Sequence, residues 1–277
     1  MHRQLPLLLL LLAVTPALAA ELFQDHVAAL KEALPEGHTV VVEAPFVVIG
    51  DEAPDRVRKR AEGTVRWAAR LLRKDFFKAE PAGPVDVWLM GTEVSYEARA
   101  KAVSGDPPST PYGYFDPEQR ALVMNIATGG GTLVHEMVHV YVEADFPACP
   151  TWFNEGLGSL FEACQEKGGH IVGLLNWRLP GLQDAIRAGP LPTIEELTAL
   201  TAAQFYGEGE GVHYGMSRYL CYYLQEQGLL RDYYRAFHAS YADDPTGYAT
   251  LRAALGEEDM AVFQERWEQW VMKLEYR

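Results

Sequence analysis

Residues 132–142 read Thr-Leu-Val-His-Glu-Met-Val-His-Val-Tyr-Val, and at their centre His135-Glu136-Met137-Val138-His139 is an instance of His-Glu-x-x-His. The three glycines of residues 129–131 precede this stretch, and Thr132 is the expected N-cap of a helix. Because residues four apart on a helix share a face, His135 and His139 would present two imidazoles to the same point. Two neutral imidazoles at this spacing suit a zinc ion.

Glu136 follows His135 directly and could act as a general base toward a water molecule at the metal without binding the metal itself. The alternative is a helix that carries two histidines by chance. The rest of the helix is mostly apolar: Leu133, Val134, Met137, Val138, Tyr141 and Val142. Such a helix is buried, and two buried imidazoles beside a carboxylate need a reason, which a metal supplies.

A catalytic zinc ion needs a third protein ligand, and two acidic residues close to His139 are candidates. Glu143 continues the same face but lies about two turns from His135, too far along the axis to share an ion. Asp145 stands where the longer pattern His-Glu-x-x-His-x-x-Gly-x-x-His/Asp keeps its third ligand. That pattern turns sharply at its glycine, and the equivalent residue here is Val142, which is poorly suited to a positive φ.

Glu155 is the third candidate, and we expect it to be the ligand. The loop of residues 146–150 contains two prolines and can reverse the chain, and a second helix follows from Thr151 to about Ala163. If this helix runs antiparallel to the first, Glu155 in its first turn returns to the imidazoles. The alternative is a glutamate that merely favours the helix dipole.

The first residues have the three-part pattern of a secretory signal peptide. Residues 1–3 form a basic head, residues 5–14 are almost wholly apolar, and Ala17-Leu18-Ala19 places small residues two apart. We therefore expect cleavage after Ala19 and a secreted or periplasmic protein. The apolar run is too short for a transmembrane span, so no membrane anchor is expected after cleavage.

Charge and cysteine content limit the possible partners and cross-links. The net charge of −14 over 277 residues argues against nucleic acid and anionic membranes as partners. Three cysteines, Cys149, Cys164 and Cys221, permit at most one intramolecular disulfide. The predicted helix separates Cys149 from Cys164 by roughly 18 Å, too far for a disulfide, and if a bond exists the expected pair is Cys164–Cys221. Three buried thiols are the alternative.

Hydrophobic periodicity predicts an α+β fold. Helices are expected at residues 22–34, 54–77 and 93–103, strands at 39–43, 46–50 and 85–90, and a hairpin at 112–116 and 121–126. After Gly131 the pattern is almost entirely helical. We expect a signal peptide (1–19), an N-terminal lobe with a small mixed sheet (20–130) and a mostly helical lobe (131–277), with the metal helix between the lobes. Strand 121–126 is the expected exposed edge, to which an extended peptide could add.

Two motifs together carry a resemblance to a known family. His135-Glu136-x-x-His139 and the later Pro150-x-Trp152-Phe153-Asn154-Glu155-Gly156 resemble the gluzincin metallopeptidases, and more closely the peptidase-MA-like families, which share a Pro-x-Trp-hydrophobic-x-Glu-Gly signature. The resemblance implies a zincin-like fold, one catalytic zinc ion held by His135, His139 and Glu155, and Glu136 as general base. It is strong at these motifs and weak over the rest of residues 40–270.

The segment that begins His213-Tyr214-Gly215 resembles the helix that opens, in related aminopeptidases, with a tyrosine assisting the oxyanion. Tyr214 and His213 are therefore the candidates for stabilising charge on the carbonyl oxygen. The alternative is that the segment's tyrosines fill a core. Asn154 would either orient Glu155 or cap its helix.

The predicted function is that of an exported zinc metallopeptidase acting on peptides or proteins. The exopeptidase motif that binds a free amino terminus is not matched, which favours an endopeptidase. One alternative is a catalytically silent, zinc-stabilised binding module of the cell envelope, although a purely structural site needs no general base such as Glu136. Another is a hydrolase of a non-peptide amide that uses the same residues.

Overall fold

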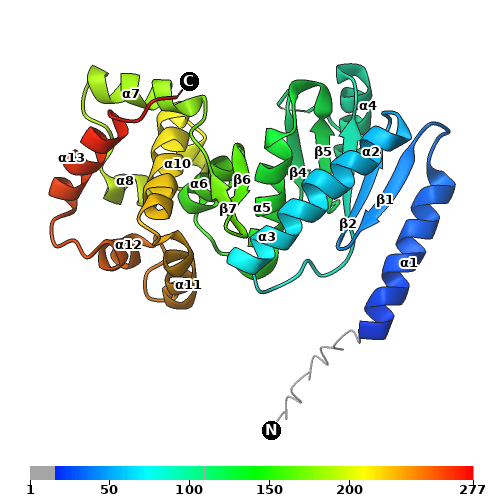
Figure 1. Cartoon of the computed structure of the whole chain (residues 1–277), viewed down its shortest axis with the longest axis horizontal. Coiled ribbons are helices and arrows are strands. Elements are labelled where there is room, and N and C mark those ends of the chain that lie inside the picture. Colours follow the sequence, from blue (N-terminus) through cyan, green and yellow to red (C-terminus); the bar gives the residue numbers. More distant parts are fainter. Residues whose placement is uncertain (1–15, 109, 277) are drawn as a thin grey trace, which may run out of the picture. The chain divides into compact units, whose positions relative to one another are not determined.

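The computed structural model describes residues 16–108 and 110–276, which belong to two compact units, Met1–Glu36 and Gly37–Arg277 (Figure 1). In the first unit the described part contains helix α1 (Pro16–Ala33). This helix begins before the predicted residue 22, and the predicted cleavage site after Ala19 falls within it. Residues 1–15, which carry most of the signal-peptide prediction, lie outside the described residues. Among the described helices, none combines the length and apolarity needed to cross a membrane.

The second unit contains a five-stranded mixed sheet in the order β1-β2-β3-β5-β4. Its strands are β1 (Thr39–Glu43), β2 (Phe46–Gly50), β3 (Val85–Met90), β4 (Gly113–Asp116) and β5 (Ala121–Asn125). The three central strands, β2, β3 and β5, are parallel to one another. The outer strands β1 and β4 pair antiparallel with β2 and β5. Every residue of β2 and β5 is buried, as expected of strands covered on both faces.

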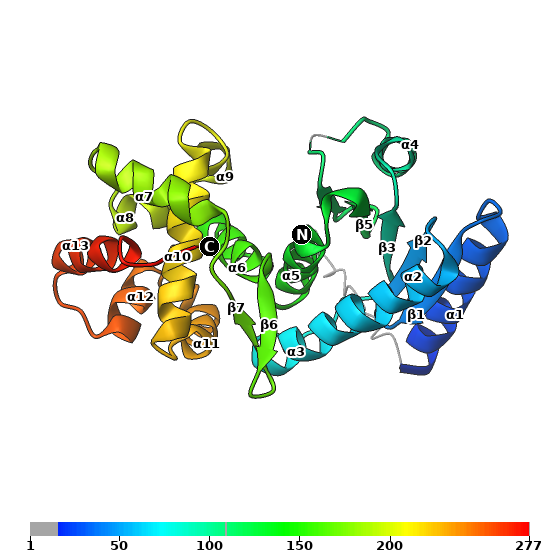
Figure 2. The same ribbon diagram turned by 45° about the horizontal axis from the view of Figure 1, so that its top comes forward.

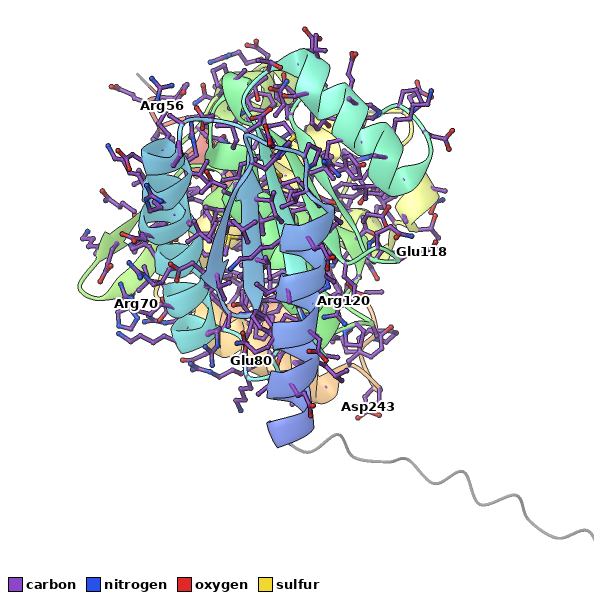
Figure 3. The ribbon with its side chains drawn as sticks, turned by 90° about the vertical axis from the view of Figure 1, so that its right-hand side faces the viewer. Arg56, Arg70, Glu80, Glu118, Arg120 and Asp243 are labelled. Atoms are coloured by element: carbon purple, nitrogen blue, oxygen red, sulfur yellow. The ribbon has the colours of Figure 1, made fainter. Side chains whose placement is uncertain are left out.

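The prediction that residues 121–126 form the exposed edge is wrong. Strand β5 lies between β3 and β4, so β4 is the strand at that side of the sheet. The composition explains the order, because β5 reads Ala-Leu-Val-Met-Asn and is buried throughout, while three of the four residues of β4 are only partly buried. A turn at Arg120, labelled in Figure 3, joins the two strands. The Arg120 guanidinium donates hydrogen bonds to the carbonyl oxygens of Gly83 and Pro84.

The predicted helix of residues 54–77 is present as three consecutive segments, of which the first two pack against β1 and the third packs against β7 and α5. They are α2 (Pro54–Arg60), the π-helical η1 (Ala61–Arg66) and α3 (Trp67–Asp75). Helix α4 (Glu93–Ser104) follows β3, begins with a capping box between Thr92 and Ser95, and packs against β3 and β5. A short 3₁₀ turn, η2 (Ile126–Thr128), leads from β5 toward the metal helix.

The rest of the chain is mostly helical, which confirms an α+β fold with a small mixed sheet and a mostly helical remainder. The helices are α5 (Gly131–Asp145), α6 (Thr151–Phe161), α7 (Arg178–Ala188), α8 (Ile194–Ala199), α9 (Ala202–Phe205), α10 (Glu210–Glu226), α11 (Leu230–Ser240), α12 (Tyr248–Leu255) and α13 (Met260–Val271). Figure 1 shows α5 between the sheet and α6. The division of the chain at residue 130 stays a prediction.

A β-hairpin that the sequence analysis missed interrupts the helices after α6. It consists of β6 (Cys164–Lys167) and β7 (His170–Gly173), joined by two glycines with positive φ, and lies between α3 and α6 (Figure 2). On the α3 side, Asp75 accepts a hydrogen bond from the backbone N–H of Ile171 at 2.8 Å, and Arg70 pairs with Glu166 at 2.7 Å. The hairpin therefore connects α3 to the mostly helical remainder of the chain.

The predicted Cys164–Cys221 disulfide is not formed, and all three cysteines are free thiols. Cys164 begins strand β6, whereas Cys221 lies inside α10 and faces Gly156 of α6. Burial raises the pKa of the Cys164 thiol to about 12 and also raises the pKa of Cys221. The alternative of three buried thiols is right for Cys221 only, because Cys149 and Cys164 are partly buried.

Candidate metal centre

Helices α5 and α6 pack closely in opposite directions because glycines lie where they meet. A Cβ atom on Gly131, at the start of α5, would lie 2.6 Å from the carbonyl oxygen of Glu162, just past the end of α6. A Cβ atom on Gly158 would lie 3.1 Å from the imidazole of His135. The N-cap of α5 is Gly130 and not the predicted Thr132, which leaves the helix without a side-chain cap. This packing brings the start of α6 to the middle of α5.

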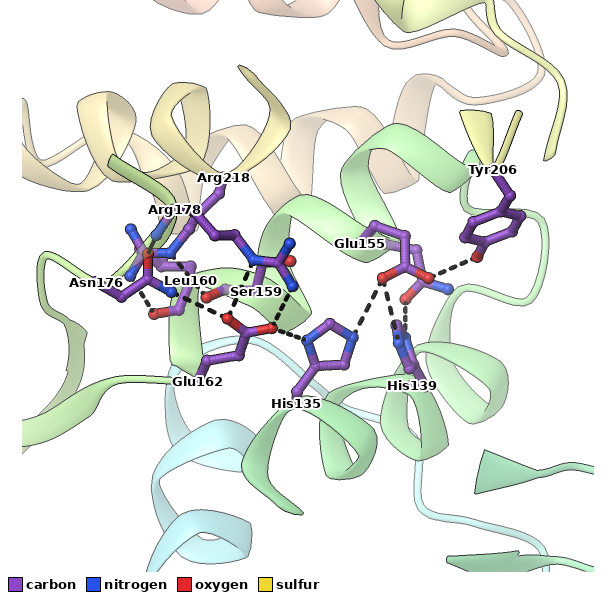
Figure 4. Close-up of polar contacts among 11 residues, drawn as sticks. His135, His139, Glu155, Ser159, Leu160, Glu162, Asn176, Arg178, Tyr206 and Arg218 are labelled. Atoms are coloured by element: carbon purple, nitrogen blue, oxygen red, sulfur yellow. Dashed lines mark hydrogen bonds and ion pairs between the residues drawn. The ribbon is translucent and has the colours of Figure 1, made fainter. Parts of the chain in front are cut away.

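Three predicted ligands meet at this crossing (Figure 4). Oε2 of Glu155 lies 3.2 Å from Nε2 of His135 and 3.7 Å from Nε2 of His139. One ligand atom from each residue lies within 4.8 Å of the other two. Oε2 of Glu155 is buried and makes no hydrogen bond to any described residue. Because Oε2 of Glu155 and the two Nε2 atoms converge on one buried point, these residues fit a bound cation, and two nitrogens with one oxygen suit zinc.

The Nδ1 atoms of both histidines have fixed neighbours. Nδ1 of His139 donates to Oδ1 of Asn154 at 2.8 Å, and Nδ1 of His135 lies 3.3 Å from Oε1 of Glu162. A proton held on Nδ1 leaves Nε2 able to bind a metal. Asn154 thus contacts His139, instead of orienting Glu155 or capping α6 as the sequence suggested.

Glu162 is a residue of the site that the sequence analysis missed. Arg178 binds its carboxylate with two hydrogen bonds, of 2.9 and 3.2 Å, and the side-chain amide of Asn176 donates to it at 3.0 Å. Its spacing of seven residues from Glu155, two helical turns, was a signal that could have identified it. Asn176 and Arg178 lie beyond the missed hairpin, and local pattern gave no indication of them.

The carboxylates and imidazoles shift one another's pKa values in the metal-free protein. Burial lowers the pKa of His135, but close contacts with Glu155 and Glu162 outweigh burial and raise it to about 10. Burial raises the pKa of Glu155 and Glu162, but contact with His135 outweighs it and lowers both values to about 2. These opposite shifts have one cause, the close approach of two buried carboxylates to the ring of His135.

Glu136 lies beside the cluster and outside the set of three ligands. Its side chain is buried, and burial raises its pKa above the usual value, whereas the charges of His135 and His139 and a hydrogen bond from the backbone of Phe115 lower it. Phe115 belongs to β4. The carboxylate of Glu136 thus lies between the metal ligands and the edge strand.

Tyr214 and His213, the two candidates for stabilising charge on the carbonyl oxygen, have different surroundings. The hydroxyl of Tyr214 faces Glu155, and burial followed by the charge of Glu155 raises the pKa of Tyr214. His213 is buried, and its Nδ1 lies 2.9 Å from the carbonyl oxygen of Phe205. Tyr206, which the sequence analysis missed, donates from its hydroxyl to Oε1 of Glu155 at 2.6 Å.

The two rejected ligand candidates have other surroundings. Asp145 accepts hydrogen bonds from the backbone N–H groups of Lys78 and Ala79, at 2.9 and 2.7 Å, and from the hydroxyl of Tyr234 at 2.7 Å. Glu143 is exposed to solvent. Asp145 therefore connects the end of α5 to the segment before β3 and to α11.

The chain is similar to solved structures of other proteins. No protein-family model matches the chain, and no curated protein matches it. The chain is similar to yeast LTA4 hydrolase, solved in complex with bestatin, with a TM-score of 0.49 and 14% sequence identity. The match covers 87% of this chain and 40% of that chain, so the protein spans well under half the length of this neighbour.

Proposed function

We propose that this protein is a zinc-dependent metallopeptidase of zincin-like fold that cleaves bonds within peptides or proteins. The observation that carries the proposal is the convergence of one ligand atom each from His135, His139 and Glu155 on a buried point, with Glu136 beside them. A structural zinc site would need no such carboxylate outside the ligand set. This arrangement therefore favours hydrolysis over a silent binding module.

Each residue of the centre has a proposed role. His135, His139 and Glu155 would hold one catalytic zinc ion. When bound, zinc supplies Lewis acidity, which lowers the pKa of water and polarises a carbonyl group. Glu136 takes the proton of the attacking water and passes it to the nitrogen of the departing amine.

The charge that develops on the carbonyl oxygen needs a hydrogen-bond donor. We propose the hydroxyl of Tyr214 for this role, because it faces the ligand Glu155. His213 is the second candidate, and its bond to the Phe205 carbonyl leaves only Nε2 for this purpose.

We propose that the substrate binds in extended form along β4. Only β5 pairs with β4 among the described strands, and the backbone N–H of Phe115 in β4 is directed at Glu136 and not at β5. Alternate backbone groups of an antiparallel strand point away from its partner. A peptide that pairs with these groups would pass beside the proposed general base, with β4 taking the place first assigned to strand 121–126.

We further propose that the protein is exported, secreted or periplasmic, with residues 1–19 as its signal peptide. This proposal rests on the three-part sequence pattern alone. The net charge of −14 supports protein or peptide substrates over nucleic acid.

The test is cleavage of a mixed peptide library by the zinc-loaded protein, with Glu136→Gln beside it. We expect cuts by the wild type and a loss of rate of about 10²- to 10⁴-fold in Glu136→Gln, which keeps its zinc. The sites of the cuts would give the side-chain preference. If neither protein cuts any peptide while both hold zinc, the peptidase proposal is wrong, and a binding module or a non-peptide amide hydrolase replaces it.

A further inference from the structure

The hydroxyl of Tyr206 makes a short hydrogen bond of 2.6 Å to Oε1 of Glu155 (Figure 4). The side chain of Tyr206 is 48% exposed, whereas Glu155 is 5% exposed. A half-exposed tyrosine can direct its hydroxyl to water at no cost, but this hydroxyl is directed at a buried carboxylate. A hydrogen bond to an ionised acceptor is stronger than a neutral one, which makes this contact energetically significant.

The two oxygens of Glu155 have different environments. Oε1 accepts the hydrogen bond of Tyr206, while Oε2 makes no hydrogen bond to a described residue and faces Nε2 of His135 and of His139. A carboxylate can bind a metal through one oxygen or through both. Because Oε1 is engaged by the phenol, Glu155 presents Oε2 alone to the imidazoles.

The position of Tyr206 is fixed by its own surroundings. Helix α9 begins with a capping box between Thr201 and Gln204, and Tyr206 ends the helix with its N–H bonded to the carbonyl oxygen of Ala202 at 3.0 Å. The ring of Tyr206 lies edge-on against the fully buried ring of Phe205, with centroids 5.5 Å apart. The carbonyl of Phe205 is in turn bound by His213. The phenol is therefore held in place before any ligand arrives.

We infer that Tyr206 is a positioning residue that keeps Glu155 a one-oxygen zinc ligand. The inference rests on the proposed zinc site and adds a residue from a separate element, α9, which the helix pair α5 and α6 does not include. By occupying Oε1, the phenol limits the protein to three ligand atoms. Three ligand atoms leave a position open for water and substrate, as a catalytic zinc site requires.

The inference is tested by metal binding, which does not depend on turnover. Tyr206→Phe removes the hydroxyl and keeps the ring against Phe205. Because the variant also loses the bond that orients the Glu155 carboxylate, we expect its zinc affinity, measured by competition with a chromophoric chelator, to fall about 10- to 100-fold. The visible absorption of the cobalt-substituted protein should change as well, because this absorption depends on the number of ligand atoms. The matched control is Tyr112→Phe, which removes the hydroxyl of a tyrosine that is 54% exposed, and we expect it to bind both metals as the wild type does.

The outcomes separate this inference from the proposed function. Unchanged zinc affinity and an unchanged cobalt spectrum in Tyr206→Phe would overturn the role of Tyr206 while the zinc site stands. Wild-type protein that binds no zinc would overturn the proposed function first. Weaker zinc binding in Tyr206→Phe together with a changed cobalt spectrum would support the inference, whether or not the wild type cleaves peptides. Circular dichroism of each variant confirms that it is folded.

Discussion

The two ring nitrogens of His135, and likewise those of His139, have different neighbours. In each residue Nδ1 has an oxygen neighbour, Glu162 for His135 and Asn154 for His139, while Nε2 faces Glu155. Such partners set the tautomer and the orientation of a metal-binding imidazole. The proposed zinc affinity therefore depends on residues that would not touch the metal.

We expect Glu162→Gln to bind zinc about 10- to 100-fold more weakly than the wild type, as is typical when a partner of a metal-binding histidine is lost. The substitution removes the charge that faces Nδ1 of His135 and weakens the double hydrogen bond from Arg178. Chelator competition measures the change. Glu166→Gln is the control, because that exposed carboxylate pairs with Arg70 on the far side of the hairpin. Equal affinities in the two variants would contradict the positioning role of Glu162.

Asp145→Ala distinguishes the two possible third ligands. We expect the variant to keep its zinc and to lose about 1–3 kcal/mol in free energy of unfolding, because the backbone N–H groups of Lys78 and Ala79 lose their acceptor. Chemical denaturation and metal analysis measure the two effects. Asp184 pairs with the exposed Arg187, so Asp184→Ala should change stability by no more than about 0.5 kcal/mol. Loss of zinc in Asp145→Ala, with zinc retained in Glu155→Ala, would overturn the ligand assignment.

The stabilisation by Asp145 should depend on pH. Burial raises the pKa of its carboxyl, but hydrogen bonds from Tyr234, Ala79 and Lys78 outweigh burial and hold the pKa below the usual value. A carboxyl with a lowered folded-state pKa stabilises fully above its unfolded value, about 3.9, and loses this contribution as the pH falls through the folded-state pKa. The stability difference between the wild type and Asp145→Ala should therefore shrink below about pH 4. Denaturation at several pH values tests this, and a difference that grows toward low pH would contradict it.

At the scale of elements, the site depends on how closely α5 and α6 approach. The glycine at 158 leaves room for the imidazole of His135, and Gly156 on another face of α6 leaves room for α10, since its Cβ would lie 2.8 Å from the carbonyl oxygen of Ser217. Two neighbouring helices therefore pack against α6 at backbone contact. This contact fixes the distance between the carboxylate on α6 and the imidazoles on α5.

We expect Gly158→Ala to weaken zinc binding. The added methyl group would lie 3.1–3.2 Å from three atoms of the His135 ring, so the ring or the helix must shift by a few tenths of an ångström. Gly181→Ala in α7 is the control, because its Cβ would meet nothing within 4 Å and alanine favours a helix over glycine by up to about 1 kcal/mol. Calorimetric zinc titration and thermal unfolding measure both variants. Wild-type zinc affinity in Gly158→Ala would show that the crossing is less constrained than its geometry indicates.

At the scale of the whole molecule, the centre collects residues from separated parts of the chain. Helices α5 and α6 supply the three ligands, β4 supplies the N–H that reaches Glu136, and α9 supplies Tyr206. All of these elements belong to the unit Gly37–Arg277. Metal binding should therefore stabilise this unit as a whole.

We expect zinc to raise the unfolding temperature of the protein and a chelator to reverse the effect. A ligand that binds only the folded state stabilises it by about 2.7 kcal/mol when its free concentration is 100 times the dissociation constant. Scanning calorimetry at several zinc concentrations measures the shift, and Glu155→Ala should abolish most of it. A shift of equal size in Glu155→Ala would place the zinc elsewhere in the protein.

The sequence by itself determined the features that depend on local periodicity. Strands β1, β2 and β3 have their predicted bounds, because a run of β-branched residues between turn residues is a local signal. The same holds for the two histidines four apart on α5, and a proline-closed loop followed by a helix was enough to predict that Glu155 returns to them.

Only the tertiary structure decided the features that depend on packing between distant segments. It placed β4 and not β5 at the edge of the sheet, put Cys164 in a hairpin that was not predicted, and brought Glu162 and Tyr206 to the centre. Tyr206 is 51 residues from Glu155, so no periodicity relates the two. Such contacts arise because the apolar faces of α6, α9 and α10 are buried in the core. The packing of these helices then determines where their polar side chains lie.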